Sequence, residues 1–299
     1  MAAVTAAMVK ELRERTGLGM MECKNALVEA GADIEKAIDD LRKSGQAKAA
    51  KKAGRTAAEG AVGVAVSADG KTAIMVEINS ETDFVARDEN FLGFVTKVAN
   101  AVLAAGETDA AKIAELPTAE GPTVEVTRQA LVQKIGENIS VRRVACAAEE
   151  GLTVGSYVHS NNKIAVLVSL RGGDEGLAKD IAMHIAAVNP LVVNAEEVPA
   201  EVLSKESEIY TAQAAESGKP ADIIEKMVSG RLRKFIEEVS LTEQAFVKDP
   251  DVKIGKMVKD ANAEILGFTR FEVGEGIEVA QVDFAAEVAE QLKGSQQAK

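Results

Sequence analysis

The sequence predicts an α+β fold built around a duplicated unit, in which each copy has a small antiparallel sheet and helices. Apolar residues have helical spacing in the N-terminal part of the chain and alternate further along. Two alternating segments, Gly63–Ile78 and Gly155–Leu170, align without a gap at an offset of 92 residues. At 299 residues the chain exceeds what one hydrophobic core usually supports, so we expect several domains.

The N-terminal segment is expected to form three short helices. Thr5 is a suitable N-cap for the first helix, and Gly17 is a suitable stop. The second helix should run from near Met20 to Gly31, and Asp33 should cap the third. These features predict a compact three-helix unit. The residues from 43 to 60 are rich in Lys, Ala and Gly, which predicts a solvated linker that is helical in part.

Each of the two aligned segments is predicted to be a β-hairpin. The pairs Asp69-Gly70 and Asn161-Asn162 lie at the turns and tolerate positive φ. The segments Ile139–Ala147 and Phe268–Val273 are candidates for a third strand in each half. The sequence thus predicts two related α+β subdomains.

The two halves differ between the hairpin and the following helix. The helices are expected over Phe91–Val102 and Leu177–Val188, an offset of 86 rather than 92, so the first half has six extra residues. These lie within Ser80–Arg87, and Asn90 is a candidate cap for the next helix. Because duplication explains the shared scaffold, function is expected where the copies differ.

Phe84 is the large apolar residue of this insertion, and its sequence neighbours are polar. One interpretation is that its side chain folds back into its own subdomain. The other is that a loop presents it as a hydrophobic anchor to a partner protein. The pattern alone leaves both open.

Two helical additions are predicted in the second half. Residues 196–240 have the pattern of two long helices, and we interpret them as a projecting antiparallel hairpin. Asp283–Leu292 is amphipathic and should form a short C-terminal helix.

The composition disfavours several classes of function. A net charge of -12, no Trp and two Tyr make a direct nucleic-acid partner unexpected. Residues 1–55 are the exception in charge, with 11 Lys or Arg against 8 Asp or Glu. Cys23 and Cys146 are far apart and are interpreted as buried, reduced residues. With no signal-peptide pattern or long apolar run, we expect a cytoplasmic protein that does not bind membranes.

Catalytic motifs are weak or incomplete. Asp69–Thr72 (DGKT) ends like a phosphate-binding loop, but the first glycine of that motif would fall on Ala65. His159 and His184 have no carboxylates or cysteines at metal-ligand spacing. We interpret His184 as structural and His159 as exposed near a turn, where it is a candidate for a surface contact. We therefore expect no enzyme activity, no metal and no cofactor.

The pair Met20-Met21 is a candidate contact surface. Two adjacent residues cannot both face one small core, so one of them should be exposed, and an exposed Met adapts readily to a partner. Lys10 and Arg13 are one helical turn apart and would add positive charge. The alternative is ordinary packing of one Met with solvated basic side chains.

Four motifs occur in a characteristic order: Lys10–Gly17 with Met20-Met21, Thr82–Ala86, Lys134–Asn138 and Arg270–Gly276. With them the chain resembles, from end to end, the bacterial elongation factor Ts family, the guanine-nucleotide exchange factors of elongation factor Tu. The resemblance implies a ubiquitin-associated-like N-terminal domain, a duplicated core, a protruding helical hairpin and a C-terminal helical module. We therefore divide the chain into residues 1–55, 56–147, 148–195 with 241–280, 196–240 and 281–299.

The resemblance also implies roles for particular residues. Thr82, Asp83, Phe84 and Val85 would displace the magnesium ion of elongation factor Tu, and the other partner contacts would be Lys10, Arg13, Met20, Met21, Ile135, Gly136 and His159. GDP release would follow. The hairpin at 196–240 would be a possible contact for homodimerisation or for a 2:2 complex. The alternatives are a ubiquitin-associated-type adaptor, a nascent-chain-binding protein, or an enzyme acting on a small molecule.

Overall fold

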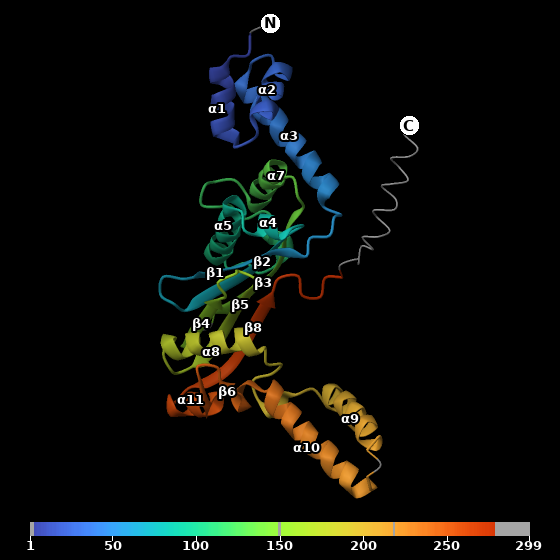
Figure 1. The fold of residues 1–299 in the computed structure, drawn as a ribbon. Helices are drawn as coiled ribbons and strands as arrows, with labels where there is room; N and C mark the ends of the chain where they lie inside the picture. The colour runs from blue at the N-terminus through green and yellow to red at the C-terminus, as the bar shows by residue number, and fades with distance from the viewer. Residues whose placement is uncertain (1–2, 149–150, 218, 279–299) are drawn as a thin grey trace, which may run out of the picture.

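A computed structural model of the chain describes residues 3–148, 151–217 and 219–278. The fold is α+β, as predicted, with helices at both ends and small antiparallel sheets between them (Figure 1). The predicted C-terminal module at 281–299 lies outside the described residues.

Three helices form the N-terminal end: α1 (Ala6–Thr16), α2 (Met20–Glu29) and α3 (Ile34–Lys52). The predicted caps are confirmed, because the side chains of Thr5 and Asp33 accept hydrogen bonds from the first turns and Gly17 ends α1 with φ of 69°. Leu12, Cys23, Leu27 and Leu41 are among the side chains that form a separate small core.

The segment predicted as a linker at 43–60 is helical in part, as expected, because α3 continues to Lys52. The expectation that it is solvated is wrong for this helical part, which packs on α7 (Val124–Ile135). Small residues permit this contact, since Gly45 lies directly against the side chain of Gln133. Gln133 Nε2 also donates to Glu22 Oε1 at 2.9 Å. Burial alone would raise the pKa of Glu22, but hydrogen bonds from Lys48 and Gln133 lower it, so this carboxylate stays charged and joins the N-terminal helices to the core.

The two predicted hairpins and their third strands are confirmed. One sheet has the order β1-β2-β3 and the other β4-β5-β8; the strands are β1 (Glu59–Val66), β2 (Thr72–Ser80), β3 (Ile139–Ala148), β4 (Leu152–Val158), β5 (Ile164–Arg171) and β8 (Glu264–Glu272). Pairing is identical under the 92-residue offset, with Val66 opposite Ala73 and Val158 opposite Ala165. Each central strand also has a bulge at the equivalent place, after Glu77 and after Ser169.

The sheets pack face to face through equivalent residues. Each half contributes four buried side chains to the shared core, and they form the equivalent pairs Val62 and Val154, Ala73 and Ala165, Met75 and Leu167, Ala147 and Phe271. The duplication inferred from sequence is therefore also present in the structure. Each copy has a core under its own helices, and the two copies share a further core between their sheets.

Helices cover the outer faces of the sheets. The first sheet carries α5 (Glu89–Ala105), α7 and the short helices α4 (Asp83–Ala86) and α6 (Ala110–Ile113), and the second carries α8 (Glu175–Val188). Gly63 and Gly155 occupy equivalent positions where these helices approach the strands. A Cβ on Gly63 would lie 2.5 Å from a side-chain methyl of Val95, whereas a Cβ on Gly155 would lie 2.5 Å from the backbone of Ala178.

This difference predicts unequal effects of the same substitution. Gly155→Ala should lower the free energy of unfolding by about 2 kcal/mol or more, because helix backbone must move to accommodate the methyl group. Gly63→Ala should cost less, since the Val95 side chain can adopt another rotamer. Urea denaturation of the two variants measures the difference, and equal losses would contradict this explanation.

The predicted hairpin at 196–240 is present as α9 (Ala200–Ala215) and α10 (Ala221–Val239), which project from the far end of the molecule (Figure 1). The sequence did not indicate the small elements beside it: α11 (Ile254–Asp260), β6 (Ala245–Phe246), β7 (Asp249–Lys253) and 3₁₀ turns at Ala195–Glu197 and Leu241–Glu243. That the hairpin joins two copies stays a prediction.

Of the two cysteines, only Cys23 is buried as expected. Cys146 is exposed because it lies near the end of β3, an edge strand of its sheet. Within the described part of the chain, no helix has the length and apolar character needed to span a bilayer.

Candidate functional site

The insertion that distinguishes the first half forms a helical turn, α4, rather than the expected loop. Thr82 is its N-cap, and Val85 and Ala86 are buried against the subdomain. The side chain of Phe84 is 82% exposed, the largest value among the big apolar side chains that the structure describes. Phe84 therefore does not fold back into its own subdomain, and the anchor interpretation is the one that agrees with this geometry.

Charged residues flank Phe84 on the same turn. Arg87 Nη2 lies 2.7 Å from Asp83 Oδ2, an exposed pair one helical turn apart. The next helix, α5, is capped by Asp88 and not by the predicted Asn90, because helix α5 already begins at Glu89. An exposed aromatic ring beside an exposed carboxylate is thus presented on a fixed backbone.

The structure brings α4 together with the turn between α7 and β3. The Glu137 carboxylate accepts hydrogen bonds from Thr82 N at 3.0 Å and Thr82 Oγ1 at 2.7 Å. Ile135 and Gly136 immediately precede Glu137, and Gly136 ends α7 with φ of 90°. The Gly136 carbonyl accepts a hydrogen bond from Lys52, the last residue of α3.

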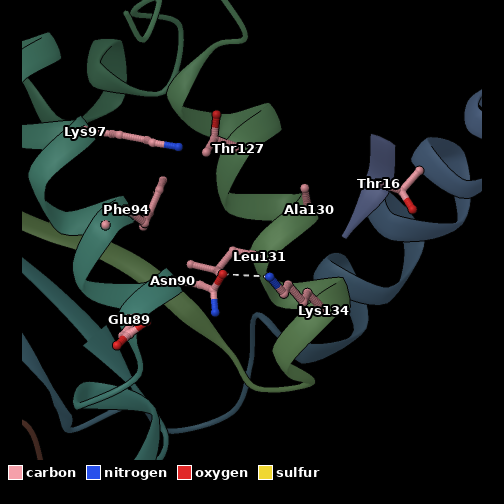
Figure 2. A pocket seen from close by; sticks show the side chains of 10 residues that line it. Thr16, Glu89, Asn90, Phe94, Lys97, Thr127, Ala130, Leu131 and Lys134 are labelled. Carbon is pink, nitrogen blue, oxygen red and sulfur yellow. Dashed lines mark hydrogen bonds between the residues drawn. The ribbon is translucent and has the colours of Figure 1, made fainter. Parts of the chain in front are cut away.

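Lys134 extends this junction toward the N-terminal helices. Its ammonium group donates to Asn90 Oδ1 at 2.6 Å, and Figure 2 shows the two side chains directed toward each other across a cavity between α5 and α7. The same ammonium lies 3.6 Å from the position of a Cβ on Gly17, at the end of α1. Thr16, the last residue of α1, also lines this cavity.

The four N-terminal site candidates lie together. Lys10, Arg13, Met20 and Met21 line one groove of about 620 Å³ between α1 and α2. The expected exposure of a methionine is confirmed, and it extends to both, because Met20 and Met21 are 61% and 62% exposed, so the alternative in which one of them packs in the core is wrong. The buried stripe of α2 begins at Cys23, so the first turn of the helix lies outside the three-helix core.

His159 lies apart from these clusters, on the β4–β5 turn. It is exposed, as predicted, and its Nδ1 is 2.8 Å from Asn161 Oδ1 of the same turn. The turn contacts β1, where Asn162 O accepts from Val62 N at 2.8 Å. In the second sheet's outer core, His184 is buried between Gln244 Oε1 and the Val247 amide.

Burial lowers the pKa of His184, so its ring is neutral at neutral pH. The Val247 amide donates to Nδ1, which leaves the proton on Nε2 to be donated to Gln244. This arrangement agrees with the structural role inferred for His184. Across the described ranges, no cluster of His, Cys, Asp and Glu side chains is arranged to hold a metal ion.

Sequence reasoning assigned no role to Glu81, Glu137 or Asn138, which surround the base of α4. Asn138 N donates to Glu81 Oε1 at 2.6 Å, the counterpart of the bond from Thr82 N to Glu137. The partners are more than fifty residues apart, so no local spacing signals the contact. The only available signal was that both segments belong to motifs shared with one family.

Comparisons with known proteins agree on one family. The family described as "Elongation factor TS" matches residues 81–275, which include α4 and the α7–β3 turn. A protein named Elongation factor Ts from Alcanivorax borkumensis is 66% identical over 287 residues, covering 96% of this chain and 100% of that protein. Proteins of the same name from Hahella chejuensis and Arthrospira platensis are 63% and 70% identical, each over its full length and over 98% and 83% of this chain.

Proposed function

Because the chain belongs to the elongation factor Ts family of translation elongation factors, we propose that it binds elongation factor Tu in its GDP-bound form and promotes GDP release. One observation carries the proposal: Phe84 is 82% exposed on a short helix that is held to the subdomain by the buried residues Val85 and Ala86. A ring held on a short turn with charged side chains beside it is available to fill a pocket of a partner, and a few such anchors supply much of the binding energy of an interface.

The proposed mechanism acts on the partner's magnesium ion. Magnesium bridges the nucleotide phosphates to a GTPase and neutralises much of their charge. We propose that Phe84 wedges into the partner while Asp83, beside it, disturbs the magnesium site, so that GDP is held less tightly. No covalent chemistry is required of this chain. Because coupling between two ligands is reciprocal, nucleotide that rebinds weakens the partner's hold on this protein.

The other proposed contacts hold the partner while α4 acts. The groove of Lys10, Arg13, Met20 and Met21 combines flexible apolar side chains with positive charge. Ile135 and Gly136 would contact the partner next to α4, and His159 would contact it from the β4–β5 turn. These contacts would supply affinity, and α4 would supply the effect on GDP.

A mixing experiment tests the proposal. Elongation factor Tu loaded with fluorescent GDP is mixed with this protein and an excess of unlabelled GDP, and fluorescence is followed by stopped flow. Release should accelerate with protein concentration and reach a plateau. Raising the magnesium concentration should reduce the acceleration, because magnesium and α4 would oppose each other. A release rate that does not depend on this protein would refute the proposal.

The groove makes a separate prediction about affinity. Replacing Met20 and Met21 together with alanine should raise the half-saturating concentration about tenfold, through loss of apolar contacts, and leave the plateau rate within about twofold. Val28→Ala is the control, since Val28 is an exposed apolar residue of α2 that does not line the groove.

Binding of the same double variant to its partner distinguishes an exchange factor from an adaptor. An adaptor of the ubiquitin-associated type would depend on the N-terminal helices alone and should lose all binding. An exchange factor should keep binding through the core. Point variants are preferable to deleting residues 1–45, because a deletion would cut α3 and uncover the face of α7 on which it packs.

A further inference from the structure

At the base of α4, two neighbouring segments each contribute a carboxylate that accepts hydrogen bonds from the other segment. Glu81, on the α4 segment, accepts from the backbone amide of Asn138 at 2.6 Å. Glu137, on the α7–β3 turn, accepts from the backbone amide and hydroxyl of Thr82 at 3.0 and 2.7 Å. Each segment thus caps a backbone donor of the other. We call Glu81, Thr82, Glu137 and Asn138 the reciprocal clamp.

We propose that the reciprocal clamp is a positioning device that holds Phe84 in its exposed, partner-ready orientation, with Glu137 as its main positioning residue. The effect on exchange rests on the proposed function above. The effect on the order of α4 does not, because it is a property of the free protein.

The hydrogen bonds inside α4 are weak, so the turn depends on the packing of Val85 and Ala86 and on hydrogen bonds from outside the turn. Its four residues are far fewer than an isolated helix needs. Its internal bonds are long: the Val85 amide lies 3.4 Å from Thr82 Oγ1, and the Ala86 amide lies 3.3 Å from the Thr82 carbonyl. The clamp bonds are shorter and involve charged acceptors, which makes them the stronger set. Phe84 cannot stabilise the turn itself, since its ring faces solvent.

The clamp also connects α4 to the N-terminal helices. Asn138 Nδ2 donates to the carbonyl of Arg55 at 2.8 Å, just beyond the end of α3. Arg55 Nη1 in turn lies 3.5 Å from Glu81 Oε1. The end of α3, the α7–β3 turn and α4 therefore meet in one network. A site joined in this way to its surroundings needs less ordering when a partner binds.

The first test uses hydrogen exchange of the free, full-length protein. In Glu137→Ala, the amides of Val85 and Ala86 should exchange about tenfold faster, because the turn loses its anchor and opens locally. Glu137→Gln should restore most of the protection, since its amide oxygen can still accept from Thr82 N. Glu264→Ala is the control, because it removes an exposed carboxylate paired with Arg171 in the other half. Unchanged exchange at Val85 and Ala86 in Glu137→Ala would overturn the proposal.

The second test is a double-mutant cycle with elongation factor Tu and labelled GDP. Glu137→Ala alone should slow the plateau rate of release at least about fivefold, and on a Phe84→Ala background it should slow it less than about twofold, because both changes act through one ring. Equal losses on both backgrounds would show that Glu137 acts independently of Phe84 and would refute the positioning role. If Phe84→Ala itself has no effect, the proposed function fails, while the hydrogen-exchange result still decides the clamp.

Discussion

Phe84→Ala is expected to slow, at least tenfold, the GDP release that this protein stimulates from elongation factor Tu, which corresponds to a loss of about 1.4 kcal/mol in the transition state for release. The ring is 82% exposed in the free protein, so its removal costs the fold almost nothing. Its whole contribution should appear only when a partner covers it. Stopped-flow release of fluorescent GDP from elongation factor Tu, at saturating concentrations of the variant, measures this effect.

Two comparisons make the result specific. Leu191→Ala removes another exposed apolar side chain, remote in sequence from α4, and should release GDP at the wild-type rate. The thermal midpoint of Phe84→Ala should match that of the wild-type protein. Wild-type release by a folded Phe84→Ala variant would eliminate the role proposed for the ring.

The second large effect concerns stability and centres on Glu77. This carboxylate is fully buried, on the central strand of the first sheet. It accepts hydrogen bonds from Arg142 Nη1 and from the Gly274 amide, both at 2.9 Å, and from Arg143 Nε. The guanidinium of Arg143 also stacks 4.2 Å from the ring centre of Phe271, on β8 of the second half. One buried charge thus links the two halves to the segment after β8.

Replacing Glu77 with alanine is therefore expected to lower the free energy of unfolding by about 3 kcal/mol at neutral pH, because two arginines and a backbone amide lose their shared acceptor. Asp260→Asn should cost less than about 1 kcal/mol, because the pair of Asp260 with Lys256 is exposed. Urea unfolding at pH 7 compares the two. A loss for Glu77→Ala no greater than that for Asp260→Asn would contradict this account.

The pKa of Glu77 predicts how the contribution of its carboxylate to the free energy of unfolding changes with pH. Burial alone would raise the pKa, but the hydrogen bonds from Gly274, Arg142 and Arg143 outweigh burial and hold it below its usual range. A group with a lowered folded-state pKa stabilises the fold above its ordinary pKa, and that stabilisation is lost as the pH falls through the lowered value. The stability gap between wild type and Glu77→Gln should therefore narrow in acid. A stability gap that widens in acid would show that the pKa of Glu77 is raised in the folded protein and not lowered.

Local sequence signals were sufficient for much of the fold. Thr5 and Asp33 are caps whose partners lie three residues away, and the hairpin turns end in Gly70 and Asn162 with φ of 71° and 56°. The alignment of the two hairpins also supported both predictions, because turn residues lie at the same place in each aligned segment. Caps and turns depend on which residues lie within a few positions of one another, and this spacing can be read from the sequence alone.

Features that depend on tertiary packing were missed or wrong. The continuation of α3 to Lys52 depends on contact with α7, and the exposure of Met21 depends on where the three-helix core ends. For the site, pattern alone left Phe84 undecided, and the family resemblance supplied its proposed role. Glu137 lies in one of the motifs that carry the resemblance, but its contact with Thr82 was not indicated, because the two residues are 55 positions apart.

The core shared between the two sheets has a consequence for synthesis of the chain. Domains tend to fold from the N-terminus as they emerge from the ribosome. All three strands of the first sheet are available by Ala148, yet the four buried side chains of the second half that cover its inner face come later, and the last of them is Phe271. A nascent chain that has folded its first half therefore carries an uncovered apolar sheet face until almost the whole protein has been made.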